Sequence, residues 1–480
     1  MTGDGATPTN PVSEASPAGP TNLRRNSVNT AGVIGQSLSA MGLSGVIGTS
    51  VPVVAITAGA GGWLSWGIAS LVILPVALSM SLLARRYSTS GGLYGLTTKA
   101  LGPLAGLVTG ALMVFLIGLA AGAGVLSFGV YFSQFLELVG IGYSRLLLGI
   151  TSVACLAFTW WLARVGAKPA AWVMFVTEIA ATIAMLVVFV AVLLNHRGDW
   201  VDERQLQLSG VSLSTIVSAV VLGIGAFGGF ESAAVYGKEA TNPRRAIPTA
   251  MVFSAVLAGA IWMFSGYVLF MGFQYSDVSL AKAAAPMGTL ADLGGIEWYS
   301  YVVDLSLSFT IGASLIAIFS WVARFMYTMS TEGVAPRAWS RIHPKYQTPT
   351  TALTQAGIVW LIGIVAMTCV SDTPLATFGD FLGDLSGFPL LLVYALVAAG
   401  AVRYQWRRHA ASIWTLVGVL GVGGMAFVLY KNLDPFPGWP SDLAFGLFVG
   451  VTVVVCVVFV VARRRDPSAF ARLGTTVEEE

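Results

Sequence analysis

The sequence predicts an all-α, polytopic membrane protein that crosses the bilayer with twelve transmembrane helices. The first observation is composition: 56% of the 480 residues are hydrophobic and only 10% are charged, whereas soluble domains carry roughly 25% charged residues. The second is length, because apolar stretches of about 20 residues recur along the chain, and each is long enough to cross a hydrocarbon core of about 30 Å. A single membrane domain with short loops follows, and no separate soluble domain fits between the stretches.

The twelve apolar stretches set the predicted domain organisation. They cover about residues 31–57, 63–84, 103–132, 143–163, 170–194, 213–237, 249–272, 298–326, 350–371, 377–402, 411–431 and 441–462. We group them into a first set of five (about 31–194), a second set of five (about 213–402) and two extra helices (about 411–462), within a transmembrane domain over 31–465. Residues 1–30 are rich in Pro, Ser, Thr and Asn and lack a signal-peptide pattern. We expect them to form a disordered cytoplasmic tail, and 466–480 to form a second cytoplasmic tail.

Basic residues predict the orientation. With the N-terminus in the cytoplasm, 21 of the 26 Lys and Arg residues fall on the inner side, as the positive-inside rule requires. This asymmetry supports an even number of spans and a multi-pass protein of the plasma membrane with both termini in the cytoplasm. The net charge of +3 then reflects topology, so we expect the lipid bilayer, and no nucleic acid, as a macromolecular partner.

Small residues interrupt the first and the sixth span at corresponding positions of the two sets of five. Glycine costs about 1 kcal/mol in a helix interior, and such paired interruptions are the best sequence pointer to a transporter site. Unwinding frees backbone N–H groups that can hold a carboxylate and carbonyls that can hold an ammonium group or a cation. We therefore predict that a free amino acid binds at Gly42, Leu43, Ser44, Gly45, Phe227, Gly228, Gly229 and Phe230.

The alternative interpretation is that these residues only pack against neighbouring helices. Small residues often mark close helix packing in membranes, and single phenylalanines in a membrane helix usually pack. Phe227 and Phe230 could instead form an apolar or cation–π wall of the site.

Carboxyl groups inside predicted spans are the next signal, because ionisable residues at membrane depth are costly and usually functional. Glu231 follows the break in the sixth span, and Glu178 lies nine residues after Pro169, roughly 14 Å along a helix. We predict that both are coupling residues that carry a proton, although Glu231 could simply accept hydrogen bonds from unwound backbone. Asp304 and Asp384, early in the eighth and tenth spans, are further candidate site acids, and Asp304 could also be structural.

Sodium is an alternative coupling ion, and a cationic amino acid or a polyamine is an alternative substrate. Hydroxyl groups on the first and eighth spans could bind sodium, but hydroxyls are common in membrane helices; they belong to Ser44, Ser306, Ser308 and Thr310. A ring of acids would suit a cationic amino acid or a polyamine rather than a neutral amino acid.

The sixth span and the turn after it resemble the amino acid–polyamine–organocation (APC) superfamily of amino acid permeases. The similar residues are Phe227-x-Gly229-Phe230-Glu231, Glu239, Asn242-Pro243-x-Arg245 and Ile247-Pro248. Supporting matches are Gly91-Gly92-x-Tyr94, Leu101-Gly102-Pro103, Arg324, Gly333, Pro336, His343-Pro344 and Pro349. The resemblance covers roughly residues 31–465. It implies the LeuT-like fold, a five-plus-five inverted repeat with broken helices 1 and 6, and a site between helices 1, 3, 6, 8 and 10.

The resemblance also favours Glu231 as a proton carrier. For the basic turn after the sixth span we keep two interpretations. Lys238, Arg244 and Arg245 enforce topology and reach lipid phosphates, or they form a cytoplasmic gate in which they pair with Glu239 or a neighbouring loop. Glu239, Asn242, Pro243 and Arg245 are the residues of this predicted gate motif.

The predicted function is secondary active transport of amino acids by alternating access, coupled to protons. The alternatives are a polyamine, amine or cationic amino acid exchanger and, outside this class, a channel. An enzyme is disfavoured because the three His and three Cys residues are scattered and match no metal, nucleophile or cofactor motif, so we expect no metal and no cofactor. The sequence gives no oligomeric state.

Overall fold

The computed structural model of the chain describes residues 23–142, 144–195, 200–274, 276–283, 285–370, 375–409, 412–465 and 470–479. Most of the N-terminal tail predicted over 1–30, and part of the C-terminal one over 466–480, lie outside these residues.

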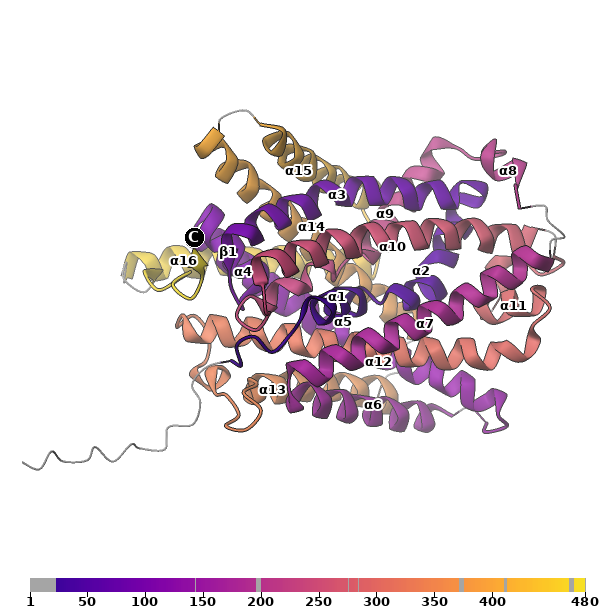
Figure 1. Cartoon of the computed structure of the whole chain (residues 1–480), viewed down its shortest axis with the longest axis horizontal. Coiled ribbons are helices and arrows are strands. Elements are labelled where there is room, and N and C mark those ends of the chain that lie inside the picture. The colour runs from indigo at the N-terminus through magenta and orange to yellow at the C-terminus, as the bar shows by residue number, and fades with distance from the viewer. Residues whose placement is uncertain are drawn as a thin grey trace, which may run out of the picture.

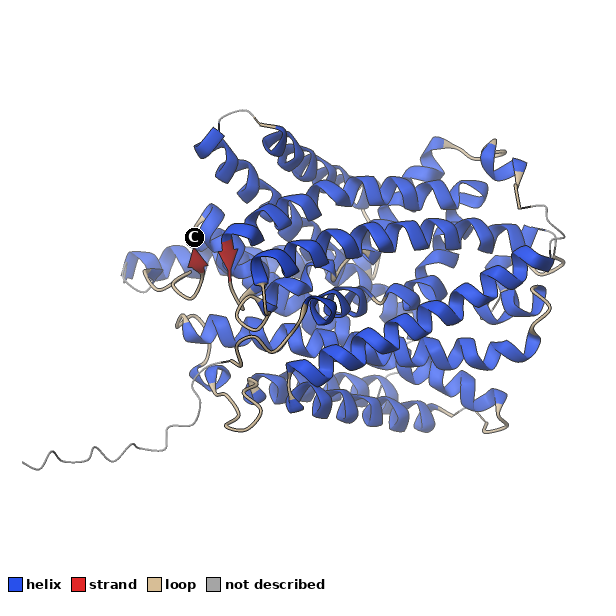
Figure 2. Ribbon diagram, viewed as in Figure 1, coloured by secondary structure: helices blue, strands red, loops and turns tan. Residues whose placement is uncertain are grey.

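The described chain is a helical bundle with two very short strands (Figure 2). The α-helices are α1 (Thr30–Met41), α2 (Leu43–Ala58), α3 (Gly62–Arg86), α4 (Gly92–Leu101), α5 (Pro103–Leu138), α6 (Arg145–Val165), α7 (Ala167–Asn195), α8 (Glu203–Leu206), α9 (Leu213–Ala226), α10 (Pro243–Gln274), α11 (Pro286–Leu293), α12 (Ser300–Thr331), α13 (Thr350–Val365), α14 (Leu375–His409), α15 (Ile413–Asn432) and α16 (Ser441–Arg465). Short 3₁₀ helices are η1 (Gly59–Gly61), η2 (Phe230–Tyr236), η3 (Leu280–Lys282), η4 (Glu297–Tyr299) and η5 (Arg337–Ser340), and η6 (Ala366–Val370) is a π-helix. The strands are β1 (Tyr87–Ser88) and β2 (Glu478–Glu479).

Each predicted span coincides with a helix or a broken helix. Within the described residues, ten helical stretches are long and apolar enough to cross a membrane. One of them, Thr30–Arg86, contains α1, α2 and α3 and so covers two predicted spans, while the 36-residue α5 coincides with the third. An all-helical polytopic membrane protein is therefore confirmed.

Helices α1 and α2 lie inside the bundle, between α10 on one side and α12 on the other, whereas α9 packs against α2 and α3 (Figure 1). Helix α1 contacts α7, α10, α12 and η2, and α2 contacts α9. Large side chains without exposed surface fill this interior, among them Trp66, Trp262 and Tyr236. The outer faces of α15 and α16 instead carry many exposed apolar residues, as expected of helices that face lipid.

Both ends of the described chain lie at the same end of the bundle (Figure 1). Arg25, just before α1, pairs with Glu478 of β2 at 3.3 Å, and Arg86 pairs with Glu479 at 3.7 Å. Strand β2 runs antiparallel to β1, with Tyr87 opposite Glu479. The even number of spans that the basic residues predict requires this arrangement.

The sequence does not predict the order of the C-terminal segment, residues 470–479. Its contacts centre on Glu332, which follows α12 and is 1% exposed. The Glu332 carboxylate accepts hydrogen bonds from Tyr94, from the N–H groups of Gly474 and Thr476, and from the Thr476 hydroxyl. Burial beside this carboxylate raises the pKa of Tyr94, so its hydroxyl stays a donor. This segment folds here because its partner lies about 140 residues away in sequence, which no local pattern reveals.

Deleting residues 470–480 is expected to lower the stability of the protein by about 1–3 kcal/mol, because the buried Glu332 carboxylate loses three donors. Thermal unfolding of the purified protein would register a lower midpoint. Glu332→Gln provides the control: the same deletion made in that variant should cost less, because an amide tolerates the loss better than an anion. An unchanged midpoint after the deletion in the wild type would contradict these contacts.

Candidate functional site

The two helix breaks lie directly against each other. Gly42 separates α1 from α2 with a left-handed φ of 65°, and Gly229 separates α9 from η2 with a φ of 119°. A methyl group at Gly229 would stand 2.5 Å from the backbone carbon of Ala40 and 2.6 Å from the backbone nitrogen of Met41. The break in helix 6 therefore needs glycine both for its φ and for this close approach, and the two interruptions form one structural unit.

Glu178 of α7 occupies the N-terminal end of α2. Its Oε1 lies 2.7 Å from the backbone nitrogen of Ser44 and 2.7 Å from the Ser44 hydroxyl. The Thr310 hydroxyl of α12 donates to its Oε2 at 2.7 Å and lies 2.8 Å from the Ser44 hydroxyl. Glu178 has no exposed surface. A helix N-terminus carries unpaired N–H groups and partial positive charge, which explains how a carboxylate is held at this depth.

Glu231 occupies the corresponding place at the second break. Its Oε2 accepts the N–H of Gly229 at 3.0 Å and the hydroxyl of Tyr394, from α14, at 2.6 Å. Its Oε1 is buried and has no hydrogen-bond partner among the described residues. Buried polar atoms are almost always paired, so an unpaired carboxyl oxygen marks a position that can take a proton or a ligand atom.

Hydrogen bonds from polar side chains of α1 tie the two breaks together. The Ser37 hydroxyl donates to the Phe230 carbonyl at 2.7 Å. Gln36 accepts from Tyr236 at 3.1 Å and donates to the Ala317 carbonyl of α12 at 2.9 Å. No role for Gln36 was predicted from the sequence. Its only signal was an amide in an apolar run.

The predicted phenylalanine wall lies in packed surroundings. Phe227 is fully buried between Trp66 and Trp262, with ring centroids 6.4 and 4.8 Å away. Phe230 is buried against Tyr394 at 5.5 Å. The indole N–H of Trp262 donates to the carbonyl of Leu43 at 2.8 Å, so this cluster fixes the start of α2. These contacts favour the packing interpretation of both phenylalanines.

The remaining small residues of the breaks have two different environments. A methyl group at Gly45 would contact Thr310 at 3.4 Å, and at Gly42 it would contact Ser314 at 3.2 Å, so both lie against α12. Gly228 faces Leu390 of α14 at 3.0 Å.

A cavity of about 650 Å³ adjoins the second break, within the usual size range of small-molecule pockets. Its lining includes Gly225 and Ala226, the last turn of α9, together with Ser50 of α2 and Asp384 of α14. Asp384 is held by the hydroxyl of Ser441. The structure thus brings Asp384 to a cavity beside the break, as a site acid requires.

Asp304 does not join either carboxylate centre. It is 4% exposed on α12, six residues before Thr310, and its backbone carbonyl accepts from the Ser308 hydroxyl at 2.9 Å. Of the hydroxyls considered for sodium, Ser44 and Thr310 meet and Ser308 bonds within its own helix. Helix α5 coincides with the third predicted span, which was expected to line the site. The side chains of residues 115–117 and 119–123, in the middle of α5, are not among those that the structure describes.

The predicted gate motif is organised around an ion pair that the sequence did not predict. Glu239 forms two contacts with the guanidinium group of Arg324 on α12, one of them 2.9 Å. Both side chains are about 97% buried or more, and the guanidinium carbon lies 4.7 Å from the Tyr236 ring centroid. Among the described ion pairs, the one that contains Glu239 joins it to Arg324 of α12, and none joins it to the basic turn.

The other gate residues start α10. Pro243 is its first residue, where a missing N–H costs nothing. The carbonyl of Asn242 accepts the N–H groups of Arg245 and Ala246 at 3.1 and 2.8 Å.

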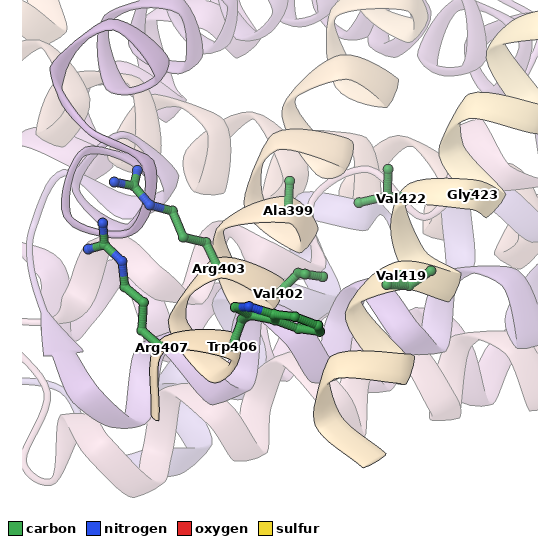
Figure 3. A pocket seen from close by; sticks show the side chains of 8 residues that line it. All are labelled: Ala399, Val402, Arg403, Trp406, Arg407, Val419, Val422 and Gly423. Carbon is green, nitrogen blue, oxygen red and sulfur yellow. The ribbon is translucent and has the colours of Figure 1, made fainter. Parts of the chain in front are cut away.

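A second hollow between α14 and α15 is separate from the breaks (Figure 3). Val402, Trp406 and Val419 line it, and the guanidinium groups of Arg403 and Arg407 point away from its apolar floor. An apolar groove with cations at one edge is ordinary for a membrane helix near the headgroup region.

Comparison with known proteins agrees with this architecture. A profile of the amino acid permease family matches residues 30–468. The chain is 25% identical over 441 residues to the branched-chain amino acid permease BcaP of Bacillus subtilis, covering 87% of this chain and 90% of that protein. It is 24% identical over 423 residues to the low-affinity putrescine importer PlaP of Escherichia coli, covering 82% of this chain and 85% of the other.

A solved structure is also similar. The crystal structure of MhsT in complex with L-phenylalanine superimposes with a TM-score of 0.59 at 17% identity, over 86% of this chain and all of that one. At this identity the likeness concerns the fold, which is the LeuT-like fold expected from the sequence.

Paired helix breaks with buried carboxylates, in a polytopic helical bundle, define a membrane transporter of the permease type. The chain belongs to the amino acid permease family. It is thus a multi-pass secondary transporter of amino acids or amines, and not an enzyme.

Proposed function

We propose that this permease moves amino acids across the cytoplasmic membrane by alternating access and that protons drive the movement. The observation that carries the proposal is the meeting of two helix breaks, each with a buried carboxyl group on a backbone N–H. Backbone N–H and carbonyl groups at such breaks suit the carboxylate and ammonium groups of an amino acid. In this proposal twelve spans place both termini in the cytoplasm, and residues near Gly42–Gly45 and Phe227–Phe230 bind the substrate.

Glu231 is the carboxyl group whose protonation accompanies the conformational change. Its unpaired Oε1 and its bond to Tyr394 support this role. In the ionised form Glu231 holds η2 to α14 through Gly229 and Tyr394. Protonation removes the negative charge that these two donors stabilise, so it loosens the contact between the second break and α14.

Glu231→Gln is expected to abolish proton-driven accumulation, because an amide cannot carry the proton. The measurement is uptake into proteoliposomes under an imposed pH gradient. Asp442→Asn, which changes an exposed carboxyl group on α16, serves as the control and should accumulate substrate normally. Undiminished proton-driven uptake by Glu231→Gln would refute the role.

An amine or cationic amino acid is the second candidate substrate class. The carboxylate of Asp384 in the cavity beside α9 favours it, and the relative PlaP is named a putrescine importer. A thermal-shift screen of the purified protein against the twenty amino acids and a set of amines separates the two classes, because a bound ligand stabilises by mass action.

A further inference from the structure

We propose that Glu178 is a built-in competitor of the substrate carboxylate for the N-terminus of α2, so that each bound amino acid brings one proton onto Glu178. This inference rests on the proposed function, because it requires a substrate that carries a carboxylate.

Glu178 occupies the N-terminus of α2. Glu178 accepts from the N–H of Ser44 at 2.7 Å and is braced by the hydroxyls of Ser44 and Thr310. The three residues come from α2, α7 and α12. The Glu178 carboxylate therefore satisfies a backbone N–H group at a break that is predicted to bind the substrate.

The second break does not offer the substrate carboxylate an alternative backbone site. The N–H of Gly229 is held by Glu231, and η2 after it is a 3₁₀ helix of 7 residues. By contrast α2 is an α-helix of 16 residues, whose aligned peptide dipoles favour an anion at its start. An arriving carboxylate thus finds its strongest backbone site at Ser44, where Glu178 stands.

Two carboxyl groups at one buried site cannot both stay ionised, so a close pair shares a proton. The α-carboxyl group is the stronger acid of the two in water, and the proton therefore settles on Glu178. No covalent bond changes: a proton leaves the water, neutralises Glu178, and the substrate anion takes over the N–H of Ser44. As an acid, Glu178 can still donate its new O–H to the hydroxyl of Ser44 or Thr310.

No cation of the neighbouring helices replaces the proton. Helices α1 and α2 contain no charged residue. The charged residues of α7 and of the other helices packed against it are Lys168, Asp304, Arg324, Asp292, Arg145, Arg164, Arg244 and Arg245. The other titratable groups of these helices are Tyr267, Tyr301, Tyr327 and Cys155, and a phenol or a thiol is a cation in neither of its protonation states.

Position along the helices separates these charges from Glu178. Lys168 lies ten residues away on α7, roughly 15 Å, and Arg324 lies fourteen residues from Thr310 on α12; it is also paired with Glu239. Asp304 is about 9 Å from Thr310 along α12. Its charge is negative, so it adds to the repulsion that protonation relieves.

Proton uptake on binding tests the inference directly. The probe is the amino acid that gives the largest shift in the thermal screen, titrated into the purified protein by calorimetry in two buffers of different ionisation enthalpy. We expect about one proton taken up per amino acid, and an affinity that falls about tenfold per pH unit once Glu178 is ionised in the free protein. In Glu178→Gln both effects should vanish while binding persists.

A matched control is Glu332→Gln, which removes another fully hydrogen-bonded and buried carboxyl group far from the breaks and should keep the proton uptake. Proton-free binding by the wild type would overturn the inference, as would an unchanged proton count in Glu178→Gln. Affinity that rises with pH and is lost in Glu178→Gln would also overturn it, because it would mean that a substrate ammonium group pairs with Glu178.

A second readout serves if Glu178→Gln does not fold. Substrate addition should create the infrared C=O band of a protonated carboxyl group, and Glu178→Asp should shift that band. No new band, or a band unchanged in Glu178→Asp, would refute the role of Glu178. If no amino acid binds in the screen, the proposed function itself fails, which is a different result from binding without a proton.

Discussion

Replacing Gly229 with alanine is expected to prevent the protein from folding into its transport-competent form. The new methyl group would stand 2.5 Å from the Ala40 carbon and 2.6 Å from the Ala40 oxygen and the Met41 nitrogen. These are backbone atoms, which cannot rotate away as a side chain can. The left-handed φ of 119° adds strain for any residue with a Cβ. Overpacking and strain together should cost about 2–5 kcal/mol.

Gly225→Ala is the matched control for this substitution. Gly225 lies one turn earlier, in α9, and a methyl group there would meet nothing within 4 Å. Alanine should stabilise that helix by about 1 kcal/mol or less. Expression, gel-filtration behaviour and thermal midpoint compare the two variants. A Gly229→Ala protein with wild-type midpoint would mean that the two breaks do not touch.

The course of the helices could be predicted closely from hydropathy, because bilayer thickness fixes the length of an apolar stretch. The differences lie at helix ends and in the short helices α4, α8 and α11 between the spans. Helix α14 continues seven residues past the predicted end at 402, to His409. Those residues include Arg403 and Arg407. Their charges end the apolar stretch, although the backbone stays helical beyond it. Hydropathy detects the hydrocarbon part of a helix and not its end.

Only part of the candidate site could be predicted from the sequence. Glycine and glutamate at membrane depth are conspicuous in a sequence, so Gly42, Gly229, Glu178 and Glu231 were found. Their partners were not, because the partner of a buried side chain is set by tertiary packing. Tyr394, 163 positions from Glu231, is an ordinary aromatic residue of an apolar stretch.

The same limit explains the cytoplasmic motif. Sequence proximity favoured Lys238, Arg244 and Arg245 as partners of Glu239. The carboxylate of Glu239, in the turn after η2, instead meets the cation of another helix, Arg324, 85 residues later. Arg324 is buried and also donates to the carbonyl of Ser320 at 2.8 Å.

Removing only one member of this ion pair should be strongly destabilising. Glu239→Ala leaves the Arg324 guanidinium group buried with the Ser320 carbonyl and the Tyr236 ring as its described contacts. Breaking a buried pair in this way typically costs about 3–5 kcal/mol. The expected result is a large drop in the thermal midpoint of the purified protein.

The double variant Glu239→Met, Arg324→Met should recover most of that loss, because apolar residues of similar volume can replace a buried ion pair at little cost. If the double variant is as unstable as Glu239→Ala, the loss comes from packing and not from an uncompensated charge. Transport by the stable double variant then tests the gate. An ion pair that holds η2 to α12 only in the closed state should, when removed, speed substrate exchange without a pH gradient. Exchange at the wild-type rate would leave the pair with a purely structural role.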